Sequence, residues 1–166
     1  MAKLDAAPVK KGFIMSAIEA RLAELGVTLP QAVAPAANYV PFVQSGALLF
    51  TAGQVPFVDG KLEATGKLGA ELDLAAGQAA ARQCAINTLA QVKAALGSLE
   101  AVKRVVKITV FVASAPGFTQ QHLVANGASD LLVQALGEAG RHARSAVGVP
   151  VLPLDAPVEV EAVVEV

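Results

Sequence analysis

The chain lacks tryptophan and contains little cysteine, histidine or charge: one cysteine, two histidines and 16% charged residues among 166. The single cysteine, Cys84, excludes an intrachain disulfide framework and suits a reducing compartment, so we expect a cytoplasmic protein. Cys84 falls within a helical pattern, which predicts a small buried side chain rather than a reactive thiol. Neither His122 nor His142 has a cysteine or carboxylate at a zinc-binding spacing, so we expect no metal site.

An excess of charge of one sign is also lacking, because 13 basic residues stand against 14 acidic ones. A protein held to nucleic acid mainly through phosphates needs a basic surface, so we expect no nucleic-acid partner. No apolar run reaches the ~18 residues of a spanning helix, so we expect no membrane partner. P-loop, dinucleotide and G-x-S-x-G motifs are missing as well. We therefore expect no cofactor and a mechanism that relies on positioning, charge and water.

What the chain does contain is apolar residues, at 54%. This exceeds the usual share of a soluble domain. We interpret the excess as surface hidden by self-association, with alanine-rich composition as the other explanation. The first fourteen residues lack the apolar core and cleavage site of a signal peptide. We expect residues 1–14 to be an extension, disordered or not native to the protein, and residues 15–166 to form a single domain.

Hydrophobic periodicity and turn residues predict the order of the elements. Ser16 and Glu19 have capping-box spacing and mark the start of the first helix. The predicted helices are 16–25, 74–96 and 118–136. The predicted strands are 39–44, 47–51, 102–113, 143–151 and 158–166. Two further short strands, 55–58 and 61–62, are predicted to form a tight hairpin. An extended arm is expected at 29–38 and a loop at 65–73. This order predicts an α+β domain in which two helices pack on one face of a mixed sheet.

The other face of that sheet also has to be hidden from water. Only the short N-terminal helix is left to cover it, which again indicates oligomerisation through the sheet.

The C-terminal stretch 141–166 predicts two strands joined by a proline-rich turn, a closing hairpin. In its second strand the valines share one face, and Glu159, Glu161 and Glu165 share the opposite face. The hairpin would bring Arg144 close to these carboxylates. Two interpretations stay open at this point. The rigid guanidinium fork of Arg144 binds a ligand carboxylate, or it forms an ion pair with a glutamate of the next strand.

Four further residues are candidates, each with a structural alternative. Glu159 is suited to positioning or deprotonating a water, or it lies on a solvated strand face. Asn126 is suited to donating to a ligand, or it lies on the surface. Phe42 either walls a pocket or packs in the core. The turn at Gly53 either presents a backbone N–H to an anion or is a simple bulge.

Three segments together resemble the RidA/YjgF family, also called the L-PSP endoribonuclease-like family: TAGQVP at 51–56, VVKITVFV at 105–112 and ARSAVGVPVLPLDAPVEVEAVV at 143–164. The likeness runs from about Asn38 to the C-terminus, and the N-terminal helix resembles an addition found in a longer subgroup. The resemblance implies a chorismate-mutase-like α+β fold of the bacillus type. It also implies a homotrimer whose sheets form an inner barrel and whose clefts lie between subunits.

The resemblance implies an activity too, that of a hydrolase or deaminase. Family members convert reactive 2-imino acids, such as 2-iminobutanoate and 2-iminopropanoate, to 2-keto acids and ammonia. The family's carboxylate-binding arginine falls on Arg144 and its water-orienting glutamate on Glu159. The turn glycine falls on Gly53, and the asparagine that lines the cleft falls on Asn126.

The chain departs from the family pattern at three positions. Phe42 replaces a tyrosine, Ala52 replaces a serine, and Ala146 replaces the cysteine after the arginine. Phe42 and Ala146 remain candidates for contacting the substrate, but the tyrosine hydroxyl is lost. This loss keeps an alternative function open, a non-catalytic trimer that binds small carboxylates or acts like a chaperone. A ribonuclease, the old family label, is disfavoured because the chain lacks a basic surface and a histidine pair.

Overall fold

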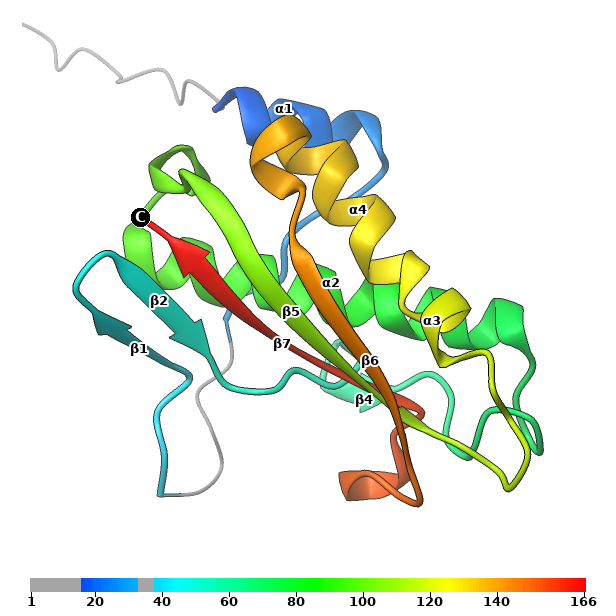
Figure 1. Ribbon diagram of the computed structural model, residues 1–166. Coiled ribbons are helices and arrows are strands. Elements are labelled where there is room, and N and C mark those ends of the chain that lie inside the picture. Colours follow the sequence, from blue (N-terminus) through cyan, green and yellow to red (C-terminus); the bar gives the residue numbers. More distant parts are fainter. Residues whose placement is uncertain (1–15, 33–37) are drawn as a thin grey trace, which may run out of the picture.

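The computed structural model describes residues 16–32 and 38–166 (Figure 1). The expected extension at residues 1–14 lies outside the described residues, as does part of the arm expected at 29–38. The helices are α1 (Ala17–Glu24), α2 (Leu74–Leu96), α3 (Gln121–Val124) and α4 (Asn126–Leu136). The strands are β1 (Phe42–Ser45), β2 (Leu48–Thr51), β3 (Phe57–Val58), β4 (Lys61–Leu62), β5 (Arg104–Ala113), β6 (Ala143–Val149) and β7 (Val158–Glu165). Short 3-10 turns are η1 (Leu99–Ala101), η2 (Gly137–Gly140) and η3 (Pro153–Asp155).

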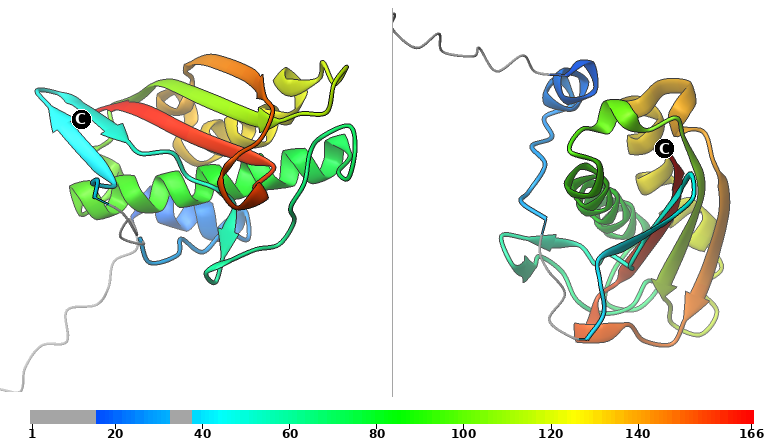
Figure 2. Two further views of the ribbon diagram at one scale, coloured as in Figure 1. Left: turned by 90° about the horizontal axis from the view of Figure 1, so that it is seen from below. Right: turned by 90° about the vertical axis from the view of Figure 1, so that its left-hand side faces the viewer.

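Five strands form a mixed sheet in the order β1-β2-β7-β5-β6, and β3 pairs with β4 in a separate small hairpin. β5 and β6 run parallel, whereas the other neighbouring pairs are antiparallel. Helices α2 and α4 pack on one side of this sheet, which we call the helix face, and we call the opposite side the open face (Figures 1 and 2). The predicted α+β class, with two helices on one face of a mixed sheet, is confirmed.

The predicted closing hairpin is wrong, because β6 and β7 are not neighbours. Strand β5 lies between them and pairs with both, in parallel with β6 and antiparallel to β7. Hairpin loops are usually two to five residues long, and the connection 150–157 is long enough to pass over β5. The strongly β-branched β5 buries Val105, Ile108, Val110 and Val112, which suits a central strand. The chain therefore places β6 and β7 on the two sides of β5 rather than next to each other.

The long helix α2 has the predicted bounds because local signals fix both of its ends. The Asp73 carboxylate accepts from the backbone N–H of Ala76 at 2.8 Å, and Gly97 adopts a left-handed conformation with φ of 77°. Cys84 on this helix is fully buried, its S–H donates to the Val158 carbonyl, and burial raises the pKa of its thiol. The prediction of a small buried side chain at Cys84 is confirmed.

The helix predicted over 118–136 begins later and is divided into α3 and α4. Gly117 turns the chain with φ of 87°, and the Gln121 side chain donates to the Phe118 carbonyl at 2.7 Å. These contacts hold the first residues of the predicted helix in a turn, so α3 begins only at Gln121. Further on, a Cβ at Gly127 would lie 2.0 Å from the backbone carbonyl oxygen of Gln78, so the glycine allows α4 to approach α2 closely.

The short helix α1 does not cover the open face. It begins with Ser16, whose hydroxyl accepts from the Glu19 N–H as the capping box predicts. α1 buries Leu22, its Arg21 donates to the Ala135 carbonyl of α4, and it lies with the other helices in Figure 2. Within the described residues α1 therefore packs with the other helices and leaves the open face uncovered.

The open face carries large exposed apolar side chains. Val43, Phe50 and Val147 are 54%, 42% and 42% exposed and come from β1, β2 and β6. The β-pairings place Val43 opposite Phe50 and Val147 opposite Phe111, so apolar pairs lie on the β1–β2 part and on the β5–β6 part of this face. A sheet face of this kind is typical of a surface that another copy or partner covers.

Candidate functional site

Arg144 is held on the helix face of the edge strand β6. It lies opposite Ile108 of β5, a fully buried core residue. Its Nη1 donates to Asn126 Oδ1 at 3.0 Å and to Ser129 Oγ at 2.9 Å, and its Nη2 donates to the His122 carbonyl at 3.1 Å. All three acceptors come from the α3–α4 segment, and all three are neutral. The structure thus places the arginine against the first turns of two helices.

The interpretation of Arg144 as the partner of a strand glutamate in an ion pair is wrong. Within residues 16–32 and 38–166 no carboxylate lies within ion-pair distance of its guanidinium. The cause is geometric: directly paired residues point to the same face, so Arg144 shares the helix face with Ile108 and Ala162. Glu159 pairs with Phe111, which pairs with Val147, and therefore points to the open face. The expected gathering of Arg144 and the carboxylates in one region does not occur within one chain.

The guanidinium of Arg144 keeps donors available. Arginine carries five N–H donors, and three of them are used by Asn126, Ser129 and His122. Nε–H and one N–H of Nη2 have no acceptor among the described residues. Two donors on adjacent nitrogens of one rigid fork are what bidentate binding of a carboxylate requires. Arg144 is half-buried, so the charge is partly shielded from water yet open to a ligand.

Glu159 and Gly53 form a second group, on the open face. A Cβ at position 53 would lie 1.8 Å from Glu159 Oε1, so the carboxylate rests directly on the glycine backbone. The contact is fixed by a backbone bridge, in which the Gln54 N–H donates to the Val160 carbonyl at 2.8 Å and the Val160 N–H donates back at 3.0 Å. This close approach is the physical reason for glycine in the Ala52-Gly53 turn.

Two causes raise the pKa of Glu159. Burial is the larger cause, and the neighbouring charge of Glu161 adds to it. A carboxylate with a raised pKa is a better proton acceptor, which suits Glu159 to activating a water. The two carboxylates share a strand face, and Glu161 lies opposite Thr109 of β5.

The remaining predicted residues lie near one or the other group. Asn126 uses its Oδ1 to orient Arg144, so its amide nitrogen is the part that remains to donate to a ligand. Ala146 follows Arg144 on the same strand face, opposite Val110. Phe42 is half-buried and packs against the core, and the Ala52 N–H donates to the Pro41 carbonyl at 2.8 Å. Neither Phe42 nor Ala52 brings a side-chain hydroxyl to the site.

Two residues that the sequence reasoning did not connect with the site belong to it. Ser129 accepts from Arg144, and His142 Nε2 lies 3.0 Å from the Ser129 Oγ. His142 Nδ1 lies 2.6 Å from the Gly140 carbonyl. A signal was present in the sequence, because Asn126 and Ser129 are three residues apart and share one helix face. His142 likewise comes two residues before Arg144, directly before β6 begins.

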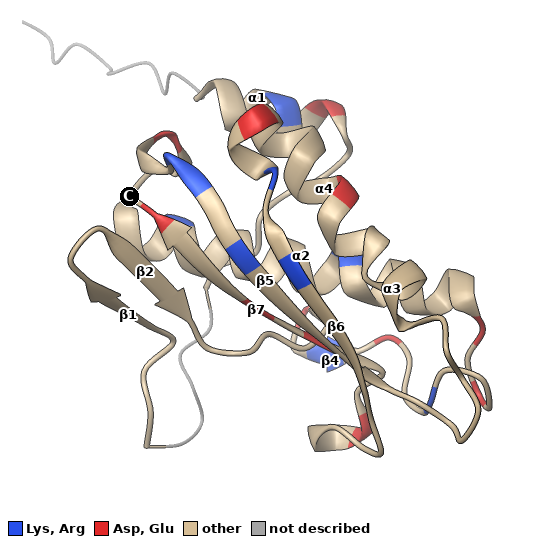
Figure 3. Cartoon of the chain, in the orientation of Figure 1, with Lys and Arg blue, Asp and Glu red and all other residues tan. Residues whose placement is uncertain are grey.

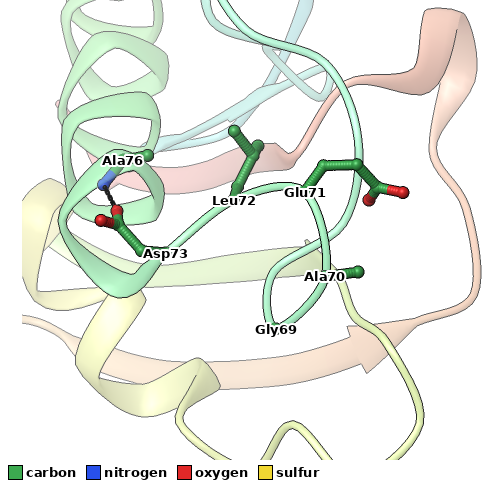
Figure 4. A pocket seen from close by; sticks show the side chains of 6 residues that line it. All are labelled: Gly69, Ala70, Glu71, Leu72, Asp73 and Ala76. Carbon is green, nitrogen blue, oxygen red and sulfur yellow. Dashed lines mark hydrogen bonds between the residues drawn. The ribbon is translucent and has the colours of Figure 1, made fainter.

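Other features of the described residues do not add a site. A hollow at the start of α2 is lined by Gly69, Ala70, Glu71, Leu72, Asp73 and Ala76 (Figure 4). Its carboxylates are used by the backbone, because Glu71 accepts from the Lys67 N–H and Asp73 caps α2. No three histidine, cysteine or carboxylate side chains of the described residues are grouped to hold a metal.

No helix among the described residues is both long enough and apolar enough to span a membrane.

Comparison with known proteins gives matches over most of the chain. A family model described as "YjgF/chorismate_mutase-like, putative endoribonuclease" matches residues 19–166. Protein TCP17 of Trypanosoma cruzi is 56% identical over 149 residues, covering 89% of this chain and 93% of that protein. The Agrobacterium tumefaciens protein Atu1372, of unknown function, is 56% identical, with a TM-score of 0.86 and coverage of 90% and 92%. E. coli TdcF with bound serine is 28% identical, with a TM-score of 0.58 and coverage of 82% and 92%.

Proposed function

The chain belongs to the YjgF/chorismate-mutase-like family and has its chorismate-mutase-like fold, and on this premise we propose that it hydrolyses reactive 2-imino acids to 2-keto acids and ammonia. One observation carries the proposal: Arg144 is oriented by three neutral acceptors and keeps two N–H donors for a ligand carboxylate. The related TdcF binds serine, which is itself a small carboxylate, and this supports the substrate class.

The chemistry needs a bound carboxylate, a positioned water and one proton acceptor. Arg144 binds the carboxylate of the imino acid and Asn126 lies beside it. Glu159 takes a proton from water as the oxygen attacks the carbon of the C=N bond, and it returns the proton to nitrogen. The resulting amino alcohol loses ammonia to leave the 2-keto acid. Imines hydrolyse spontaneously, so positioning and electrostatic help of modest size are sufficient.

The proposed site requires a second copy of the chain. In one chain Arg144 points to the helix face and Glu159 to the open face, so a single copy does not present both groups to one ligand. Members of this family are typically homotrimers. We therefore place the site in a cleft between subunits, with Arg144 and Asn126 from one copy and Gly53 and Glu159 from the next. The exposed apolar side chains of the open face support burial of this face in the trimer.

The function is tested by coupling the protein to an amino-acid dehydratase or oxidase that releases a 2-imino acid, and by measuring keto-acid formation. We expect the protein to accelerate this step and Arg144→Ala to lower kcat/KM about 100-fold, since a charged anchor for the substrate is removed. Arg141→Ala is the matched control, because Arg141 is exposed and pairs with Glu138 on the surface. Equal acceleration by Arg144→Ala and by the unaltered protein would refute the role of Arg144.

One observation favours a second candidate function, a non-catalytic trimer that binds small carboxylates or acts like a chaperone. The family tyrosine and serine are replaced by Phe42 and Ala52, so two hydroxyl groups that could assist proton movement are gone. Binding of 2-oxobutyrate without any acceleration of imine hydrolysis would support this alternative over the enzyme.

The endoribonuclease role in the family description is not the one we propose. Lys and Arg are distributed over several elements, with Asp and Glu among them (Figure 3), and the net charge is −1. The two histidines do not form a pair, since His142 is engaged with Ser129 and Gly140 and His122 is exposed. RNA cleavage that survives rigorous purification and is lost in Arg144→Ala would argue for the ribonuclease instead.

A further inference from the structure

A directional chain of hydrogen bonds leads away from Arg144 into the protein. His142 Nδ1 lies 2.6 Å from the Gly140 carbonyl, which can only accept, so Nδ1 carries the proton. In the neutral ring Nε2 is then an acceptor, and its partner is Ser129 Oγ at 3.0 Å. The Ser129 hydroxyl therefore donates to His142, and its oxygen accepts from Arg144 Nη1 at 2.9 Å. Every hydrogen bond in this chain therefore has a defined direction: Arg144 donates to Ser129, Ser129 donates to His142, and His142 donates to the Gly140 carbonyl.

The surroundings of His142 favour the neutral ring that this chain needs. Burial, the largest cause, and the positive charge of Arg144 lower the pKa of His142, and together they outweigh the bond to Gly140, which raises it. A protonated ring would turn Nε2 into a second donor toward Ser129 Oγ and would place two cations around one hydroxyl. The neutral ring avoids both problems.

We infer that Ser129 and His142 are positioning residues, which fix the guanidinium of Arg144 for the substrate carboxylate. The inference rests on the proposed function and deepens it. Asn126 and Ser129 occupy both hydrogens of Nη1, and His122 occupies one of Nη2. These contacts fix the plane of the guanidinium, and Nε–H and one N–H of Nη2 remain for the ligand. The substrate carboxylate binds to these remaining donors.

The role of His142 is more than to fill space, because its Nε2 is the acceptor for the Ser129 hydroxyl. Without it, the Ser129 hydroxyl proton has no fixed acceptor, so the oxygen lone pair that Nη1 uses is no longer held toward Arg144. A half-buried arginine with a freed Nη1 can rotate and present a different edge. The predicted consequence is weaker binding of the carboxylate, while the proton transfer at Glu159, a residue of the other group, is unaffected.

The test compares Ser129→Ala, His142→Leu and His142→Gln, with Arg144→Ala as reference and Arg141→Ala as control. Glutamine keeps an acceptor oxygen near the place of Nε2, whereas leucine keeps only volume. KM and kcat of imine hydrolysis are measured, and binding of 2-oxobutyrate is followed by calorimetry, which does not depend on turnover. The ¹⁵N shifts of the His142 ring report which nitrogen carries the proton.

We expect Ser129→Ala and His142→Leu to raise KM and the Kd of 2-oxobutyrate roughly 10-fold with kcat within about twofold, since one hydrogen bond to a charged group is lost. His142→Gln should restore most of the affinity, and the ring should show a protonated Nδ1. Wild-type affinity in Ser129→Ala and His142→Leu, or a protonated Nε2 in the unaltered protein, would overturn the inference. An equal loss in His142→Gln and His142→Leu would overturn it as well, because the ring would then act only by its shape.

Arg144→Ala separates this inference from the proposed function. If the unaltered protein does not accelerate imine hydrolysis, the proposed function fails, and if Arg144→Ala binds 2-oxobutyrate and hydrolyses imines like an active unaltered protein, the role of Arg144 fails. If Arg144→Ala is impaired but Ser129→Ala and His142→Leu are not, only the positioning role fails.

Discussion

Arg144 and Glu159 lie on strands separated only by β5, yet their environments differ in almost every respect. Arg144 lies on the helix face and is oriented by Asn126, Ser129 and the His122 carbonyl, all of them neutral. Glu159 lies on the open face against the backbone of Gly53, with another carboxylate as its neighbour. The first environment keeps a fixed charge in a fixed plane. The second makes a carboxylate easier to protonate.

This contrast divides the proposed reaction into two halves. The arginine group binds a carboxylate and has no need to exchange protons. The glutamate group is suited to exchanging a proton with water and has no positive charge of its own to hold a substrate. Because the two groups point to opposite faces of one sheet, each is incomplete alone, and the proposed site needs two copies of the chain.

The largest expected effect comes from removing the proton acceptor. Glu159→Gln keeps the size of the side chain and its place against Gly53, but it cannot take a proton from water. We expect kcat to fall about 100-fold or more, with the Kd of 2-oxobutyrate changed little, since Arg144 still binds the carboxylate. Steady-state kinetics with calorimetry measures both quantities.

Glu165→Gln is the matched control for this substitution. Glu165 lies on the same strand and pairs with Arg104 at the surface, at 2.9 Å, so its loss should change little. A Glu159→Gln variant that loses affinity and keeps kcat would reverse the roles assigned to the two groups.

The smallest expected effect is a shift in pH dependence. Activity should fall as the pH is lowered through the raised pKa of Glu159, because the protonated carboxyl cannot act as a base. Glu161→Gln removes the like charge that contributes to this raised pKa, while the larger contribution of burial stays. We therefore expect the acidic limb of the kcat profile to move partway to lower pH. A limb that stays in place or moves to higher pH would show that another group controls it.

Features that depend on neighbouring residues could be predicted from the sequence. The bounds of α2 follow from Asp73 and Gly97, and the alternation in β7 correctly separates buried Val158 and Val160 from Glu159. The α+β class follows from the order of elements.

Features that depend on distant residues could not be predicted in this way. Nothing near β6 or β7 in the sequence specifies that β5 lies between them, because strand pairing is decided by packing across the whole sheet. The partners of Arg144 depend on how α3 and α4 are placed, which is why an ion pair remained open. The residues alone left structural alternatives open for Gly53 and Glu159, and the family resemblance favoured their functional roles. Their contact could not be predicted, because it forms only where residues 51–54 lie against the start of β7.

The most direct test of a site shared between copies is to mix two inactive variants. Arg144→Ala and Glu159→Gln subunits are unfolded together, refolded as mixed oligomers and assayed for imine hydrolysis. If Arg144 of one copy works with Glu159 of the next, about a quarter of the clefts in an equal mixture contain both wild-type residues. The account predicts recovery of about that fraction of wild-type activity. A mixture as inactive as either variant alone would contradict it.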